Sequence, residues 1–249
     1  MKTTAERAAA LGSIHGFDSN ALRAGDGVSQ ELCDLILAFA LIFNDCRDIL
    51  LWHEETQGEA PKAQALNRLS GEYGGTITHT FRLLAAVLHE LGELVQKNSQ
   101  VLNDPFFRDK VLPKLDKDAR ERWERLEALA RGKKAEKPLD DLLYYLRNKS
   151  VYHYDAPDLR PAYDRKFPPG SSERAEQPLV SVGNTVRGTR WYFADAVAYD
   201  LLESEAATRG LAPLGPKLSK ALTDLVVTLA RIVEAFLQAR TPWTEFRED

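Results

Sequence analysis

Residues 139–155 read LDDLLYYLRNKSVYHYD, a leucine-rich half followed by a polar half. Leucines at positions 139, 142, 143 and 146 recur at helical spacing, so the first half predicts an amphipathic helix docked on a core. Proline is favoured in the first turn of a helix, where Pro138 would lie. Asp140 and Asp141 would lie near the N-terminus of the helix, where the helix dipole favours negative charge. The polar half then follows the end of a packed helix, a rigid place from which to hold reactive groups.

Three longer apolar stripes predict the helices that would form this core, at residues 30–56, 76–97 and 217–240. The first stripe alone runs through Leu32, Leu35, Ile36, Phe39, Phe43, Cys46 and Leu50. With 44% hydrophobic residues the chain can bury a core, and we expect an all-α helical bundle. We interpret residues 1–27 as an N-terminal arm, 28–240 as one helical-bundle domain, and 241–249 as a C-terminal tail.

The remaining segments predict peripheral insertions and at most one small β-hairpin. Residues 116–130 form a charged helix with a narrow apolar face, expected on the surface, and a basic linker at 131–137 follows it. The Gly74-Gly75 pair predicts a break before the second long helix. Pro-rich residues 156–178 predict a long loop, residues 179–182 and 189–192 a hairpin, and residues 193–208 another helix.

The polar half of the opening stretch has the residues for phosphate chemistry. On one straight helix Arg147 and His153 would be roughly 9 Å apart along the axis and about 120° apart around it. They could therefore flank a phosphate if the helix breaks near Tyr152 or a second subunit contributes. Arginine is a permanently charged forked donor and histidine titrates near neutral pH. Another interpretation stays open: His153 caps a helix end, and Arg147 pairs with Asp155 or another acidic neighbour.

Arg147-Asn148, followed after four further residues by His153, resembles the signature of HEPN domains: an arginine, a polar residue, and a histidine shortly after. The resemblance covers about ten residues and includes the flanking Tyr-Leu-Arg-Asn and Val-Tyr-His-Tyr-Asp context. One toxin branch of that family has a tyrosine two residues after the histidine, where this chain has Asp155.

This resemblance implies an α-helical bundle that dimerises, with a ribonuclease site at the dimer cleft. It implies catalytic roles for Arg147, Asn148 and His153, and we expect substrate contacts from Lys149, Tyr152 and Tyr154. The four tyrosines at 144, 145, 152 and 154 could stack on unpaired bases, although core packing explains them equally well.

The net charge of the chain limits where RNA could bind. The formal net charge of −4 argues against a protein that coats nucleic acid indiscriminately. Residues 131–174 carry ten Lys or Arg against seven Asp or Glu, a mildly basic segment in an acidic chain. An RNA site would therefore be a local patch around the motif.

Other kinds of site are less favoured by the sequence. His53-Glu54-Glu55 and the stretch from His89 to Glu93 lack the Glu-x-x-His order of a di-iron bundle, so we expect no metal and no cofactor. Gly71, Gly74 and Gly75 lack the spacing of a phosphate-binding loop.

Cys33 and Cys46 are expected to be buried thiols in a reducing compartment. The start of the chain is polar and shows no signal peptide, and the longest apolar run is too short to span a membrane. We therefore expect a cytoplasmic protein without a membrane partner.

The leading hypothesis is a HEPN-type, metal-independent endoribonuclease of toxin–antitoxin or anti-phage defence systems. It would be a homodimer that cleaves single-stranded RNA by attack of the ribose 2′-hydroxyl, with an antitoxin or defence protein as a further partner. The alternative is a non-catalytic helical dimer that binds RNA or protein, and a metal-dependent bundle enzyme ranks third.

Overall fold

A computed structural model describes residues 4–9, 11–58, 68–130, 137–146, 156–170, 178–185 and 189–246. These residues are mostly helical, with one two-stranded sheet, and confirm the all-α prediction. They divide into two compact units. Unit 1 comprises Met1–Asp48, Glu90–Lys133 and Ala221–Asp249, and unit 2 comprises Ile49–His89 and Lys134–Lys220. The interpretation of residues 28–240 as one domain stays a prediction.

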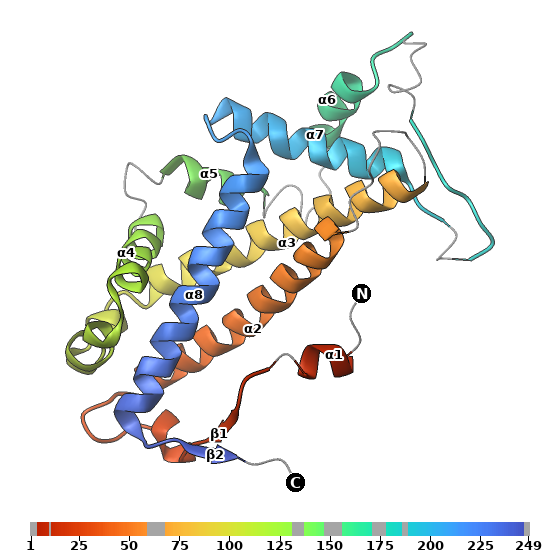
Figure 1. Cartoon of the computed structure of the whole chain (residues 1–249). Coiled ribbons are helices and arrows are strands. Elements are labelled where there is room, and N and C mark those ends of the chain that lie inside the picture. The colour runs from red at the N-terminus through yellow and green to blue at the C-terminus, as the bar shows by residue number, and fades with distance from the viewer. Residues whose placement is uncertain are drawn as a thin grey trace. The chain divides into compact units, whose positions relative to one another are not determined.

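Three long helices, α2 (Gln30–Gly58), α3 (Arg68–Lys97) and α8 (Leu214–Arg240), each supply residues to both units (Figure 1). Their predicted stripes are largely buried, as helical periodicity requires. The predicted break at Gly74-Gly75 is wrong, because α3 begins at Arg68 and continues through both glycines. Glycine is tolerated inside a helix at a cost of about 1 kcal/mol relative to alanine, so packing can override the local signal.

In unit 1, the charged helix α4 (Lys117–Ala130) is anchored by one large side chain. Trp123 is 1% exposed, and its ring lies 5.9 Å from that of Phe39 on α2 and 5.7 Å from that of Phe107. Phe107 begins a π-helical turn (Phe107–Val111), between 3₁₀ turns at Val101–Asn103 and Leu112–Lys114. The narrow apolar face of α4 therefore belongs to the core of unit 1.

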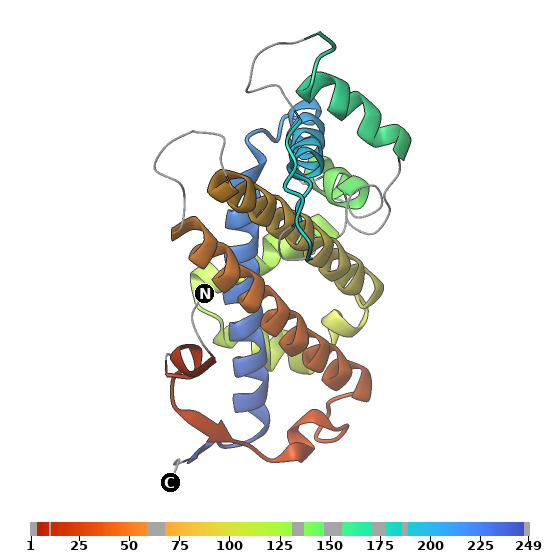
Figure 2. The same cartoon turned by 90° about the vertical axis from the view of Figure 1, so that its right-hand side faces the viewer.

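The first and last segments of unit 1 pair with each other. Strand β1 (Ile14–Gly16) runs antiparallel to β2 (Thr244–Phe246), beyond the end of α8 (Figure 2). A short helix α1 (Thr4–Ala8) precedes β1, and a 3₁₀ turn (Ser19–Leu22) follows it. Arg240, at the end of α8, donates to the carbonyls of Ala21, Arg23 and Gly25 and so fixes the loop after β1.

In unit 2, α5 (Lys137–Leu146) and α6 (Ala156–Lys166) both contact α7 (Tyr192–Thr208), and Figure 1 shows α6 beside α7. Helix α6 corrects the prediction of a loop over residues 156–178. Ala162 and Phe167 share a buried cluster with Val197 and Leu201 of α7. Burial of this apolar face stabilises a helix that Pro161, in its interior, disfavours.

The predicted hairpin is reduced to a single antiparallel bridge within the described residues. Ser181 and Arg190 exchange two backbone hydrogen bonds of 2.8 Å. Val180 and Val182 are largely exposed, so this segment lacks a buried face that would favour a longer ladder.

Candidate functional site

The predicted catalytic cluster, Arg147, Asn148 and His153, lies outside the described residues, together with Lys149, Tyr152 and Tyr154. Both flanking helices are described. Leu142 and Leu143 of α5 are almost completely buried, which confirms the predicted docked helix before the motif. Helix α6 begins at Ala156, directly after the motif. Residues 147–155 therefore connect two helices that both pack on α7.

The two described tyrosines of the opening stretch make different contacts. Tyr144 is 61% exposed and its ring meets His89 edge-on, with the ring centroids 5.7 Å apart. The guanidinium of Arg209 lies 5.3 Å from the ring centroid of Tyr145, at cation–π distance. Tyr145 thus helps to hold α5 against α7, while the ring of Tyr144 is largely accessible to solvent.

The histidines considered for a metal site are packed among aromatic rings. His53 is 3% exposed, lies 5.6 Å from the ring of Phe81, and contacts the Gln57 amide at 2.8 Å through Nε2. Burial lowers the pKa of His53, against an opposing effect of Glu54. Among the described residues, no group of three or more His, Cys, Asp or Glu side chains is arranged to hold a metal ion.

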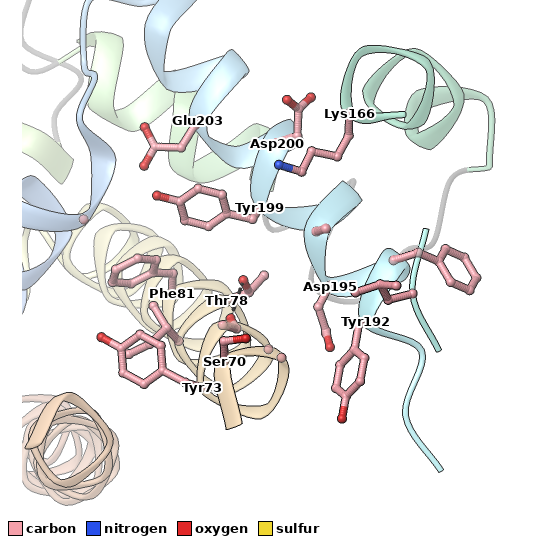
Figure 3. Close-up of a pocket in the computed structure, with 18 of the residues that line it drawn as sticks. Ser70, Tyr73, Thr78, Phe81, Lys166, Tyr192, Asp195, Tyr199, Asp200 and Glu203 are labelled. Atoms are coloured by element: carbon pink, nitrogen blue, oxygen red, sulfur yellow. Dashed lines mark hydrogen bonds between the residues drawn. The ribbon is translucent and has the colours of Figure 1, made fainter. Parts of the chain in front are cut away.

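Unit 2 contains a groove of about 1020 Å³, which we call the α3–α7 groove (Figure 3). One wall is the face of α3 that carries positions 70, 71, 74, 77, 78 and 81. The other is the face of α7 that carries positions 192, 195, 196, 199, 200 and 203. Spacings of three and four residues place each set on one side of its helix. The ends of α2 and α6, residues 179–180, Pro213 and the start of α8 supply the rest of the lining.

Glycines in α3 allow the start of α7 to approach closely. A Cβ atom at Gly71 would lie 2.6 Å from the ring of Tyr192, and one at Gly75 would collide with the side chains of Arg190 and Asp195. Gly74 differs, because a Cβ there would meet no atom within 4 Å, and this residue lines the open groove. Gly74 and Gly75, which predict a helix break from sequence, therefore serve groove shape and packing within a continuous helix.

The carboxylates of the groove differ in their partners. Asp195 pairs with Arg190 at 3.0 Å, and Arg190 also pairs with Glu72 at 3.0 Å. Asp200 pairs with Arg165 at 2.8 Å.

Glu203 accepts a hydrogen bond from the backbone N–H of Leu214 at 3.4 Å, and has no ion pair within the described part of the chain. The one lysine of the described lining, Lys166, is exposed at the end of α6 (Figure 3).

Tyr199 lies between Glu203 and Phe81 in Figure 3 and gives the groove an aromatic wall at this point. Burial raises the pKa of the Tyr199 phenol, and the negative charge of Glu203 raises it further. The phenol is therefore neutral at physiological pH and presents a ring face and a hydroxyl beside the carboxylate.

This groove was not predicted from the sequence, although one of its two walls has a recognisable pattern there. Asp195, Tyr199 and Glu203 follow one another at intervals of four in a helix that was predicted correctly. They form a polar stripe beside the buried Val197 and Leu201. Its partner face on α3 was hidden, because the predicted helix started after Gly75.

Comparison with protein-family models, with curated proteins and with solved structures finds no match for this chain. Within the described residues, no helix has the length and apolar character needed to cross a membrane.

Proposed function

We propose that this protein is a metal-independent endoribonuclease of the HEPN type that cleaves single-stranded RNA. The observation that carries the proposal is the Arg147-Asn148-x4-His153 motif, directly after a docked helix. Further support comes from the two helices that flank residues 147–155 in the sequence, because both pack on α7. Packed helices of this kind are suitable elements from which to present reactive groups.

In the proposed reaction, the ribose 2′-oxygen attacks the adjacent phosphorus while His153 accepts the 2′-hydroxyl proton. The bond from phosphorus to the 5′-oxygen breaks, and that oxygen takes up a proton from the imidazolium of a site histidine. The products are a 2′,3′-cyclic phosphate and a free 5′-hydroxyl. Arg147 stabilises the charge on the phosphorane, and Asn148 orients the histidine or a ribose hydroxyl.

The proposal includes a homodimer whose two copies of the motif share one cleft, as the resemblance implies. Lys149, Tyr152 and Tyr154 are the proposed RNA contacts beside it. We place the protein in the cytoplasm, in a toxin–antitoxin or anti-phage defence system, with an antitoxin or defence protein as regulator and without a membrane partner.

Cleavage of a labelled unstructured RNA by purified variants tests the proposal. His153→Ala should lower the cleavage rate by about 10²–10⁴-fold, the usual contribution of general acid–base catalysis, while RNA affinity changes little. Arg147→Ala should weaken both binding and cleavage, since it removes a permanent phosphate partner. Thermal melts establish that each variant is folded.

His15→Ala and Arg160→Ala are matched controls, because both residues are exposed and lie outside the motif, and both variants should cleave like the parent. Equal cleavage by the parent and His153→Ala, with matching melts, contradicts the catalytic role. A parent that does not cleave RNA, with a His153→Ala change that alters only dimerisation or stability, supports the non-catalytic helical dimer instead.

A further inference from the structure

We propose that the α3–α7 groove binds a small organic cation, a molecule with an aromatic or apolar body whose protonated amine meets Glu203. The described residues that line the groove lie outside the motif in the sequence, and the inference does not rest on the proposed function.

The size and walls of the groove fit a ligand of this class. Small-molecule sites typically occupy about 300–1,000 Å³ and are lined mainly by apolar and aromatic groups. The α3–α7 groove, at about 1020 Å³, lies just above the upper limit of this range. Its aromatic lining residues are Tyr73, Phe81, Phe167, Tyr192, Phe193 and Tyr199. Aromatic faces carry negative electrostatic potential and attract organic cations.

The charged side chains that line the groove favour a positively charged ligand. Arg190 and Arg165 already balance Asp195 and Asp200, which leaves Glu203 as the lining carboxylate without an ion pair among the described residues. Glu203 is half-buried, and its contact with the N–H of Leu214 fixes its position without neutralising its charge. A half-buried carboxylate is stabilised by a cationic partner, so an ammonium group on the ligand would complete the site.

The remaining ionisable groups do not alter this preference. Of the three lining carboxylates, at 195, 200 and 203, Glu203 alone is without an arginine partner among the described residues, and the one lining ammonium group, at Lys166, is exposed at the end of α6. His53, at the α2 side, is buried and has its pKa lowered, so it adds no positive charge at neutral pH. A polyanion such as an RNA backbone would place phosphates beside these carboxylates, whereas an amine meets complementary charge.

The test compares three probes of nearly equal shape: tryptamine, which is cationic; tryptophol, which is neutral; and indole-3-propionate, which is anionic. Binding to the full chain at neutral pH is followed by NMR titration. We expect tryptamine to bind roughly tenfold or more tightly than tryptophol, and indole-3-propionate to bind weakest.

Glu203→Gln keeps the shape and the acceptor for the Leu214 N–H but removes the charge, so tryptamine affinity should fall by about tenfold while tryptophol affinity stays the same. Glu205→Gln is the control. It removes a carboxylate from the same helix, but one that pairs with Arg209 outside the groove.

Gly74→Leu provides an independent variant if Glu203→Gln does not fold. Gly74 borders open space in the groove, so a leucine side chain should fill part of it and weaken binding of both tryptamine and tryptophol. Gly92→Leu is its control, since Gly92 is also in α3 and also has free space, but does not line the groove.

The inference is overturned if tryptamine does not bind at millimolar concentration or if the three probes bind equally. It is also overturned if folded Glu203→Gln or Gly74→Leu binds tryptamine like the parent. Loss of RNA cleavage bears only on the motif, whereas loss of tryptamine binding bears only on the groove, so the two proposals can fail separately.

Discussion

At the scale of single residues, Arg240 makes the most concentrated set of contacts described in unit 1. Its guanidinium is almost fully buried, with its side chain 5% exposed, and donates to the carbonyls of Asn20, Ala21, Arg23 and Gly25 at 2.6–3.3 Å. Those carbonyls belong to a segment more than 200 residues away in the chain, so this side chain links the two ends of the unit in addition to the β1–β2 pairing.

Replacing Arg240 by methionine should therefore lower the free energy of unfolding by roughly 2–4 kcal/mol, because hydrogen bonds from a charged donor are lost. Urea denaturation measures the change. Arg231→Met is the control, since Arg231 is on the same helix and, among the described residues, forms only an exposed pair with Glu234. It should cost no more than about 0.5 kcal/mol. Equal losses in the two variants would contradict the role of the Arg240 contacts.

Buried His53 should make the free energy of unfolding depend on pH. Burial lowers its pKa in the folded state, so below the unfolded value of 6.5 the unfolded chain binds a proton that the folded chain does not. The free energy of unfolding should therefore fall as the pH drops below 6.5. His53→Leu should reduce this dependence, measured by urea denaturation between pH 8 and pH 5.5. An identical pH dependence in the parent and in His53→Leu would contradict the assignment.

At the scale of elements, the adjacent glycines of α3 should respond in opposite directions to alanine. Gly74→Ala should raise the free energy of unfolding by about 0.5–1 kcal/mol, because alanine favours the helix and the new methyl group meets no atom within 4 Å. Gly75→Ala should lower it by about 1–3 kcal/mol, because the methyl group collides with Arg190 and Asp195. Thermal denaturation compares the two variants, with Gly92→Ala as a control expected to match Gly74→Ala. A similar gain for both would contradict the close packing at Gly75.

The elements also show what the sequence could predict. Helices with long apolar stripes were predicted to within a few residues, as for α2 and α7, because periodicity reports burial directly. Helix α6 and the first turns of α3 were missed, because Pro161 and the glycines are local breakers that tertiary packing overrides. The importance of Trp123 was missed for a related reason: a single buried ring can anchor a helix that is otherwise charged.

The two candidate sites also differ in how far they can be predicted from local sequence. The motif at Arg147 and His153 is contiguous in sequence and could be proposed from it. The α3–α7 groove needs two helix faces more than a hundred residues apart, so only half of its signal, the stripe of Asp195, Tyr199 and Glu203, was present locally.

At the scale of the whole molecule, the ribonuclease proposal requires two chains to share a cleft. Light scattering at micromolar concentration should therefore report a mass near twice the 27.9 kDa chain. A strict monomer that nevertheless cleaves RNA would show that one chain holds a complete site, and would contradict the composite cleft.

The chemistry of the cut distinguishes a metal-independent ribonuclease from a metal-dependent nuclease. Two labelled RNAs that differ only in a 2′-deoxy substitution at the cleaved nucleotide are incubated with the protein in EDTA. The ribonuclease account predicts cleavage of the all-ribose strand to a 2′,3′-cyclic phosphate and a 5′-hydroxyl, and no cleavage at the 2′-deoxy position. Cleavage of the 2′-deoxy strand at that position, or cleavage that occurs only when magnesium or manganese is restored, would contradict it.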